Sequence, residues 1–338
     1  MKSIFKPLAI AAAVTAASVG YSGAANAEVA NNALGEWIIV PYYTVNEDWV
    51  TGIHIINTSA DTQVLKVRFR RKADSLDVLD FNLILSPYDE WTGTVRGEDG
   101  AVELVTSDRS CSAPVALQAN GRAPFQIQEG VTEGYVEIVG MGAANVGSPI
   151  GIASKHTNGE PLSCIDASTN FFAAAVVAND QTIQTSSSTN PLLSGPTFYG
   201  ETDNVLKVSY FLRDNESGIE FGNNAVHIQD FSTVPMMTHQ QFGLESCASQ
   251  GLTACLNGFD FPNINGGGLN SGYQGAYDAI IRPDLGAIAV ANDWSYNATT
   301  GAATDWVITI PGQYTMLDPN GLVNPTVTYD YRDIPVIA

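Results

Sequence analysis

The chain of 338 residues carries 15 lysines and arginines against 35 aspartates and glutamates, a formal net charge of −20. So large an excess of negative charge repels nucleic acids and anionic lipid headgroups, which argues against both as partners. The length is enough for one large or two ordinary domains, each with a substantial core.

The N-terminus has the pattern of a cleavable secretory signal. Lys2 and Lys6 form a small basic region before an apolar run at residues 8–19, and Ala25 and Ala27 are the small residues that signal peptidase requires before the cut. The run is shorter than the about 20 residues of a membrane-spanning helix. We therefore expect residues 1–27 to be removed as a signal peptide and residues 28–338 to be secreted, to the extracellular space or the outer cell surface, without insertion into a membrane. The periplasm is the alternative location. Removal of two lysines leaves 13 basic and 35 acidic side chains, or −22.

From residue 36 onward, apolar residues recur with a period of two, which predicts β-strands. In the segment 64–70, Lys66, Arg68 and Arg70 alternate with apolar residues, which predicts a strand with one face in a core and the other in water. Further strands are predicted at residues 37–40, 52–57, 79–85, 134–139, 206–212, 287–290, 305–310 and 326–329.

Strands at intervals of about ten residues, separated by Gly, Pro and Asn, favour an antiparallel arrangement. We predict a mainly β fold, an antiparallel immunoglobulin-like β-sandwich with long loop insertions. The mature region is either one elaborated sandwich or two, with a boundary near 180–200. Loops are predicted at residues 179–197 and 257–275, and short helices at residues 171–179 and 274–281.

The four cysteines, Cys111, Cys164, Cys247 and Cys255, all lie in the region expected to be exported, where disulfides form and persist. Four cysteines allow three pairings, and sequence alone does not choose among them. A short polar segment between Cys247 and Cys255 could close as a loop, so we predict the pairs Cys247–Cys255 and Cys111–Cys164. A zinc site fits less well because the sequence has no close Cys-x-x-Cys pair.

The histidines His54, His156, His227 and His239 are too far apart for a local metal motif. His227 and His239 flank Asp230 and form a candidate metal or acid–base pair if the chain folds back, although a structural role is favoured. The sequence has no Gly-x-Ser-x-Gly nucleophile elbow, so a hydrolase would need a site assembled from distant residues.

Two acidic turns offer the oxygen ligands that calcium prefers. Asp214 and Glu216 lie in an Asp-Asn-Glu-Ser-Gly sequence, and Asp318 begins an Asp-Pro-Asn-Gly sequence. Neither matches the EF-hand loop, and turn formation explains both more simply. Calcium is therefore the one candidate cofactor, with these three residues as its candidate ligands.

Aromatic residues gather early in the chain and offer a candidate surface for stacking a sugar or a peptide. The candidate ligand-binding residues are Trp37, Tyr42, Tyr43, Trp49 and Trp91. The competing interpretation is packing, because aromatic residues that alternate along strands are more often core or cross-strand contacts.

Several segments resemble blocks of a family of exported proteins from Gram-negative bacteria. They are Trp-Ile-Ile-Val-Pro-Tyr-Tyr-Thr-Val at 37–45, Ile-Ile-Asn-Thr at 55–58, Val-Arg-Phe-Arg at 67–70, the segment 79–91 and the segment 304–311. The resemblance touches both ends of the mature chain. It implies export and a location at the cell surface, and it carries over no catalytic residue.

We therefore expect a non-enzymatic secreted or cell-surface protein with a structural or adhesive role in a bacterial envelope or extracellular layer. Its expected partners are further copies of itself or other surface proteins, contacted through sheet edges and loops. One alternative is a calcium-assisted carbohydrate-binding protein that takes a glycan as partner. The second is a secreted hydrolase with a spatially assembled site.

Overall fold

The computed structural model describes residues 28–73, 77–113, 115–125, 127–177, 199–200, 202–231, 296–297, 299, 302–303, 307 and 309. Several predicted features lie outside the described residues: the signal segment 1–27, the strands at 287–290 and 326–329, the helix at 274–281, both long loops, and most of the strand at 305–310.

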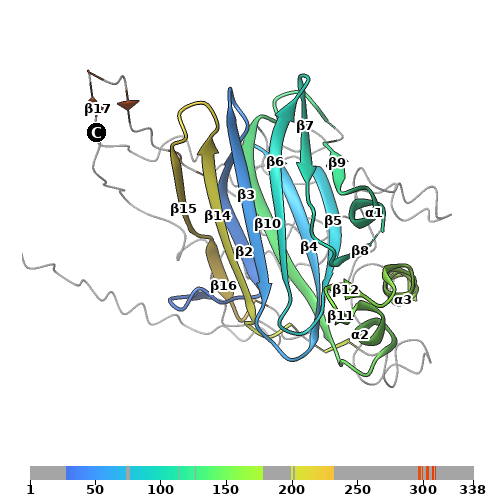
Figure 1. The fold of residues 1–338 in the computed structure, drawn as a ribbon. Coiled ribbons are helices and arrows are strands. Elements are labelled where there is room, and N and C mark those ends of the chain that lie inside the picture. Colours follow the sequence, from blue (N-terminus) through green and yellow to red (C-terminus); the bar gives the residue numbers. More distant parts are fainter. Residues whose placement is uncertain are drawn as a thin grey trace, which may run out of the picture.

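The described residues form two antiparallel β-sheets that lie one behind the other (Figure 1). The first has eight strands, in the spatial order β1 (Glu28–Val29), β16 (Val226–Gln229), β2 (Trp37–Thr44), β10 (Glu133–Ala144), β4 (Thr62–Arg71), β5 (Asp77–Leu85) and β8 (Cys111–Ala113), with β13 (Tyr199–Gly200) also paired to β10. The second has six, in the order β15 (Glu220–Asn224), β14 (Leu206–Asp214), β3 (Trp49–Asn57), β6 (Glu90–Glu98), β7 (Ala101–Val105) and β9 (Arg122–Pro124). Two short ribbons pair β11 (His156–Thr157) with β12 (Glu160–Pro161), and β17 (Tyr296–Asn297) with β18 (Ala302–Ala303).

The mainly β, antiparallel sandwich is confirmed, and the strands predicted between residues 37 and 212 lie within β2, β3, β4, β5, β10 and β14. The immunoglobulin-like character stays a prediction. Strands β14 and β16 follow the proposed boundary at 180–200, yet they pair with β3 and β2. The described residues on both sides of that boundary therefore belong to one sandwich.

The main core fills the space between the two sheets. Leu65, Val67 and Phe69 of β4 contribute to it together with Ile53 and Ile55 of β3, all at most 2% exposed. Burial of each such side chain contributes roughly 1.5–3 kcal/mol. The apolar positions of the alternating pattern thus bind the two sheets together.

Within the part of the chain that the structure describes, three helices accompany the sheets: α1 (Ala116–Asn120), α2 (Pro149–Ser154) and α3 (Cys164–Val177). Helix α2 starts where the Ser148 hydroxyl accepts the Gly151 N–H at 3.1 Å. Helix α3 starts where Ser163 Oγ accepts the Asp166 N–H at 3.2 Å. The helix predicted from residue 171 thus begins earlier, because a serine cap and not alanine content determines its first turn.

A second apolar layer covers the opposite face of the eight-stranded sheet. Trp37, Ile39 and Met141 lie in it together with Ile150 of α2 and Phe171 of α3. A strand that is buried on both faces needs apolar residues at successive positions, which explains the uninterrupted apolar start of β2.

The basic side chains of β4 lie in the interior of the protein and not on its surface. The prediction that Lys66, Arg68 and Arg70 face water is wrong, because these residues are at most 1% exposed. Their ion pairs join Lys66 Nζ to Asp80 Oδ1 at 3.1 Å, Arg68 Nη2 to Asp77 Oδ2 at 2.9 Å, and Arg70 Nε to Glu137 Oε2 at 2.6 Å. Alternation shows which residues share a face of a strand, but not whether a further layer covers that face.

Candidate functional site

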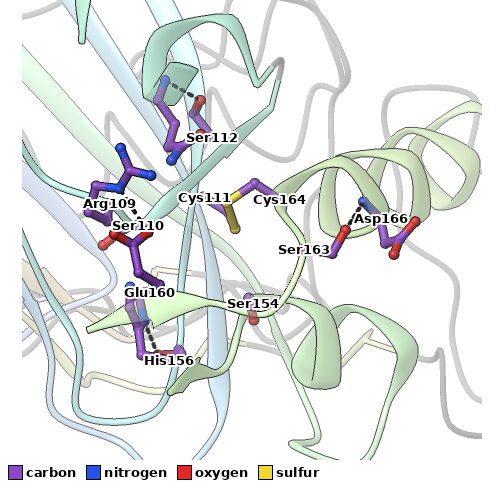
Figure 2. Close-up of a disulfide and its surroundings, with 12 residues drawn as sticks. Arg109, Ser110, Cys111, Ser112, Ser154, His156, Glu160, Ser163, Cys164 and Asp166 are labelled. Carbon is purple, nitrogen blue, oxygen red and sulfur yellow. Dashed lines mark hydrogen bonds and ion pairs between the residues drawn. A yellow bond between two sulfur atoms is a disulfide. The ribbon is translucent and has the colours of Figure 1, made fainter. Parts of the chain in front are cut away.

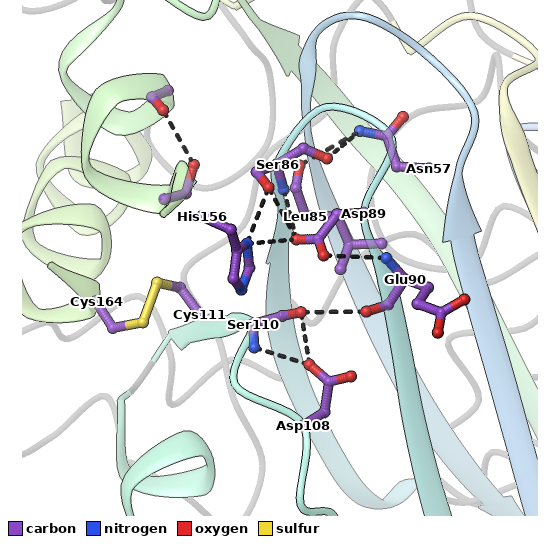
Figure 3. Close-up of polar contacts among 12 residues, drawn as sticks. Asn57, Leu85, Ser86, Asp89, Glu90, Asp108, Ser110, Cys111, His156 and Cys164 are labelled. Carbon is purple, nitrogen blue, oxygen red and sulfur yellow. Dashed lines mark hydrogen bonds and ion pairs between the residues drawn. A yellow bond between two sulfur atoms is a disulfide. The ribbon is translucent and has the colours of Figure 1, made fainter. Parts of the chain in front are cut away.

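Ser86, Asp89 and His156 form a polar cluster where the turn between β5 and β6 meets the segment after α2 (Figure 3). Asp89 Oδ2 accepts hydrogen bonds from the Ser86 backbone N–H and hydroxyl, both at 3.0 Å. His156 Nδ1 lies 3.0 Å from Ser86 Oγ and 3.2 Å from Asp89 Oδ2. The cluster therefore joins two segments about seventy residues apart in the sequence.

The residue types are those of a serine hydrolase, but the geometry is not. In a catalytic triad the histidine uses one ring nitrogen for the carboxylate and the other for the serine. Here the same atom, His156 Nδ1, faces both Ser86 and Asp89, and Ser86 is only 4% exposed. The hydrogen bond to the Asp89 carboxylate raises the pKa of His156 above its ordinary value. The cluster is thus suited to hold a charged imidazole between two segments.

Two further links fasten the same region (Figure 2). A disulfide joins Cys111 of β8 to Cys164, the first residue of α3, which confirms this predicted pair. Arg109 Nε donates to Glu160 Oε2 of β12 at 2.9 Å. The helices α2 and α3 are therefore attached to the sandwich by a covalent bond, an ion pair and the His156 cluster. The predicted pair Cys247–Cys255 lies outside the described residues.

His227 of β16 is a buried link between the two sheets. Its Nε2 accepts the Val208 backbone N–H of β14 at 2.9 Å, and its Nδ1 lies 2.8 Å from the Ala225 carbonyl oxygen. These bonds require a neutral ring with the proton on Nδ1, and burial lowers the pKa of His227 accordingly. His227 therefore has a structural role in the described chain, and its predicted partner His239 lies outside it.

In the acidic turn at the end of β14, the Asp214 carboxylate accepts hydrogen bonds that hold the turn together. Asp214 accepts hydrogen bonds from the Glu216 N–H at 3.0 Å, the Ser217 N–H at 3.3 Å and the Ser217 hydroxyl. The Ser217 hydroxyl bond lowers the pKa of Asp214. The part of the chain that the structure describes contains no group of three or more His, Cys, Asp or Glu side chains placed to hold a metal. Asp318 lies outside it.

The five aromatic residues proposed for ligand binding are not brought together on the surface. Trp37, Tyr43 and Trp91 are at most 1% exposed, because they belong to the two cores. Their burial removes them from the set of candidate ligand contacts. Tyr42 and Trp49 are half-buried, and the Trp49 ring packs edge-on against Phe221 at a centroid distance of 5.9 Å.

The exposed face of the six-stranded sheet carries a groove of about 600 Å³ that crosses β15, β14, β3 and β6. Strand register places its side chains in two adjacent rows on one face. The polar row is Asn224, Ser209, His54 and Thr92, and the aromatic row is Gly222, Phe211, Gly52 and Thr94. The groove thus combines the exposed ring of Phe211 with hydroxyl, amide and imidazole groups, and Tyr210 also contributes to its lining.

Phe211 is the centre of the aromatic row. It is 37% exposed, and its cross-strand neighbours in the row, Gly222 and Gly52, have no side chains that could cover it. A Cβ atom at Gly52 would lie 2.0 Å from Cε1 of Phe211, so the ring rests directly over the Gly52 backbone. The absence of a side chain at this position determines where the ring lies.

The sequence shows which faces of the strands point outward, but not how the strands align to form the groove. The odd-numbered apolar residues of β3 and the even-numbered ones of β14 face the core, so the alternate positions of each strand identify its outward face. The cross-strand register, which brings residues 54, 92, 209 and 224 side by side, is a tertiary property with no local signal. The Ser86–Asp89–His156 cluster is equally non-local.

Comparisons with protein-family models, with curated proteins and with solved structures find no match to this chain. Within the described residues, no helix combines the length and apolar character needed to cross a membrane.

Proposed function

We propose that the protein is a non-enzymatic, exported β-sandwich that acts at the bacterial cell surface or in an extracellular layer, where its surface contacts give it a structural or adhesive role. The observation that carries the proposal is the exposed groove on the six-stranded sheet, which is built on regular strands and is lined by side chains suited to contact a ligand.

The reinforcement of the sandwich supports an extracellular location. Disulfides persist in oxidising compartments and are rare in the bacterial cytosol, and Cys111–Cys164 closes a separation of 53 residues. The signal-like segment at residues 1–27 is in keeping with export.

The two alternative functions, a secreted hydrolase and a calcium-assisted carbohydrate-binding protein, receive less support from the described residues. Two of the described histidines do not suit a hydrolase, which needs a histidine free to move a proton: His227 has both ring nitrogens engaged with backbone groups, and His156 presents one nitrogen to two partners. Calcium-assisted binding through Asp214 competes with the hydrogen bonds by which that carboxylate forms its turn.

Cell fractionation tests the proposal. Cells that express the full-length chain are separated into cytoplasm, osmotic-shock fluid, outer membrane and surface wash, and the protein is detected by immunoblot. Recovery in the surface wash or with the outer membrane supports the proposed role. Recovery solely as a monomer in the osmotic-shock fluid overturns it.

A further inference from the structure

We propose that the groove on the six-stranded sheet binds a neutral oligosaccharide. This inference rests on the proposed surface role and names the chemical class of the ligand. It assigns binding to residues of β3, β6, β14 and β15 that line the groove, and not to the five aromatic residues that the sequence singled out.

The aromatic half of the argument is the position of Phe211. The apolar C–H face of a pyranose ring needs a flat aromatic surface that is open on one side and supported on the other. The Phe211 ring is supported by the Gly52 backbone and remains 37% exposed. The two glycines that flank it in the row keep neighbouring side chains from covering it.

The polar half of the argument is the row of polar side chains that runs beside the aromatic row. Asn224, Ser209 and Thr92 offer amide and hydroxyl groups that both donate and accept hydrogen bonds, as sugar hydroxyls do. His54 lies between them, with Nε2 3.1 Å from Glu90 Oε2. Since adjacent strands are about 4.8 Å apart, this row extends along a ligand of two or three sugar rings.

The charge of the lining favours an uncharged ligand. The described residues that line the groove include no lysine, arginine, aspartate or glutamate, and His54 is paired with Glu90 at the rim. The formal net charge of −20 for the whole chain adds a repulsive background for polyanions. The groove volume of about 600 Å³ is within the range of small-ligand sites. Neutral sugars fit this combination better than acidic glycans.

The test uses the secreted, processed protein with four neutral probes: cellohexaose, laminarihexaose, mannohexaose and hexa-N-acetylchitohexaose. Hyaluronan and heparin hexasaccharides are the acidic comparison. Titration calorimetry measures binding by the wild type and by three variants. Phe211→Ala removes the ring. Gly52→Ala displaces the ring from its position over the Gly52 backbone without removing any polar group. Phe221→Ala is the matched control, since Phe221 is 54% exposed on β15 but does not line the groove.

We expect saturable binding of at least one neutral probe, a loss of at least about tenfold in affinity for Phe211→Ala and Gly52→Ala, and a change below about twofold for Phe221→Ala. Circular dichroism and thermal unfolding verify that each variant is folded. Should Phe211→Ala prove unfolded, the Gly52→Ala result decides. The inference is overturned if no neutral probe binds, if an acidic probe binds more tightly, or if Phe221→Ala weakens binding as much as Phe211→Ala.

The two proposals fail separately. A wild-type protein that is found at the cell surface but binds none of the neutral probes overturns the glycan inference and leaves the surface role in place. A protein confined to the periplasm overturns the surface role, whatever the calorimetry shows.

Discussion

Nδ1 of His156 lies 3.2 Å from Oδ2 of Asp89, so a titratable ion pair joins the segment after α2 to the turn between β5 and β6. His227 is the opposite case, a buried neutral ring whose Nε2 accepts the Val208 N–H at 2.9 Å. The pKa of His156 is raised and that of His227 is lowered. The two histidines therefore contribute to stability in opposite directions as the pH changes.

His156→Asn is expected to lower the free energy of unfolding by roughly 1 kcal/mol at pH 5.5, because it removes a partly exposed, charge-assisted hydrogen bond to Asp89. Since the folded pKa of His156 is raised, the contribution is complete below the unfolded pKa of about 6.5 and is lost as the pH rises through the folded value. Urea unfolding of wild type and variant between pH 5 and 8.5 measures this. A difference that grows with pH would show that the sign is wrong.

His227→Leu is expected to cost about 2–4 kcal/mol at pH 8, because it leaves the buried Val208 N–H and Ala225 carbonyl without their partner. The folded pKa of His227 is lowered, so the wild-type contribution is complete above about pH 6.5 and is lost as the pH falls through the folded value. The same urea series measures it, with the partly exposed His54→Gln as control, which should stay within about 0.5 kcal/mol. Equal losses in both variants would contradict a linking role for His227.

Replacement of both Cys111 and Cys164 by serine is expected to lower stability by roughly 4 kcal/mol, since the disulfide spans 53 residues. Arg109→Gln removes the exposed ion pair to Glu160 in the same region and should cost less than about 1 kcal/mol. Guanidinium unfolding under non-reducing conditions compares the two. If the cysteine variant unfolded at the wild-type midpoint, the helical segment would not depend on its covalent attachment.

Glu137→Gln is expected to cost about 3–5 kcal/mol, because it removes one of the two carboxylates, Glu137 and Asp77, that form ion pairs with the buried Arg68 and Arg70. Lys72→Gln breaks an ion pair to Glu133 whose lysine side chain is 61% exposed, and should change stability by less than about 1 kcal/mol. Thermal unfolding at neutral pH distinguishes them. A Glu137→Gln protein as stable as Lys72→Gln would mean that the buried cluster tolerates the loss of this carboxylate.

The strands and their faces could be predicted from the sequence because the signals are local. The alternation in residues 64–70 identifies both β4 and the side chains that enter the main core. It cannot show that Lys66, Arg68 and Arg70 are buried, since that depends on their pairing with Asp80, Asp77 and Glu137 across the sheet. The same limit explains why Trp37, Tyr43 and Trp91 suggested a surface but lie in the cores.

The candidate groove could not be predicted, because its composition follows from register. Phe211 and Gly52 are far apart in the sequence and meet only because β14 pairs with β3. The disulfide between Cys111 and Cys164 was predicted correctly, since few cysteines leave few pairings. Pairings among a few cysteines and periodic strand patterns can thus be predicted from the sequence, whereas contacts between distant strands cannot.

Immunogold electron microscopy of cells that express the full-length protein tests the surface role most directly. Label on intact cells, at the same density as on cells with a permeabilised outer membrane, is the predicted result. Label that appears only after permeabilisation would place the protein inside the envelope and contradict the account.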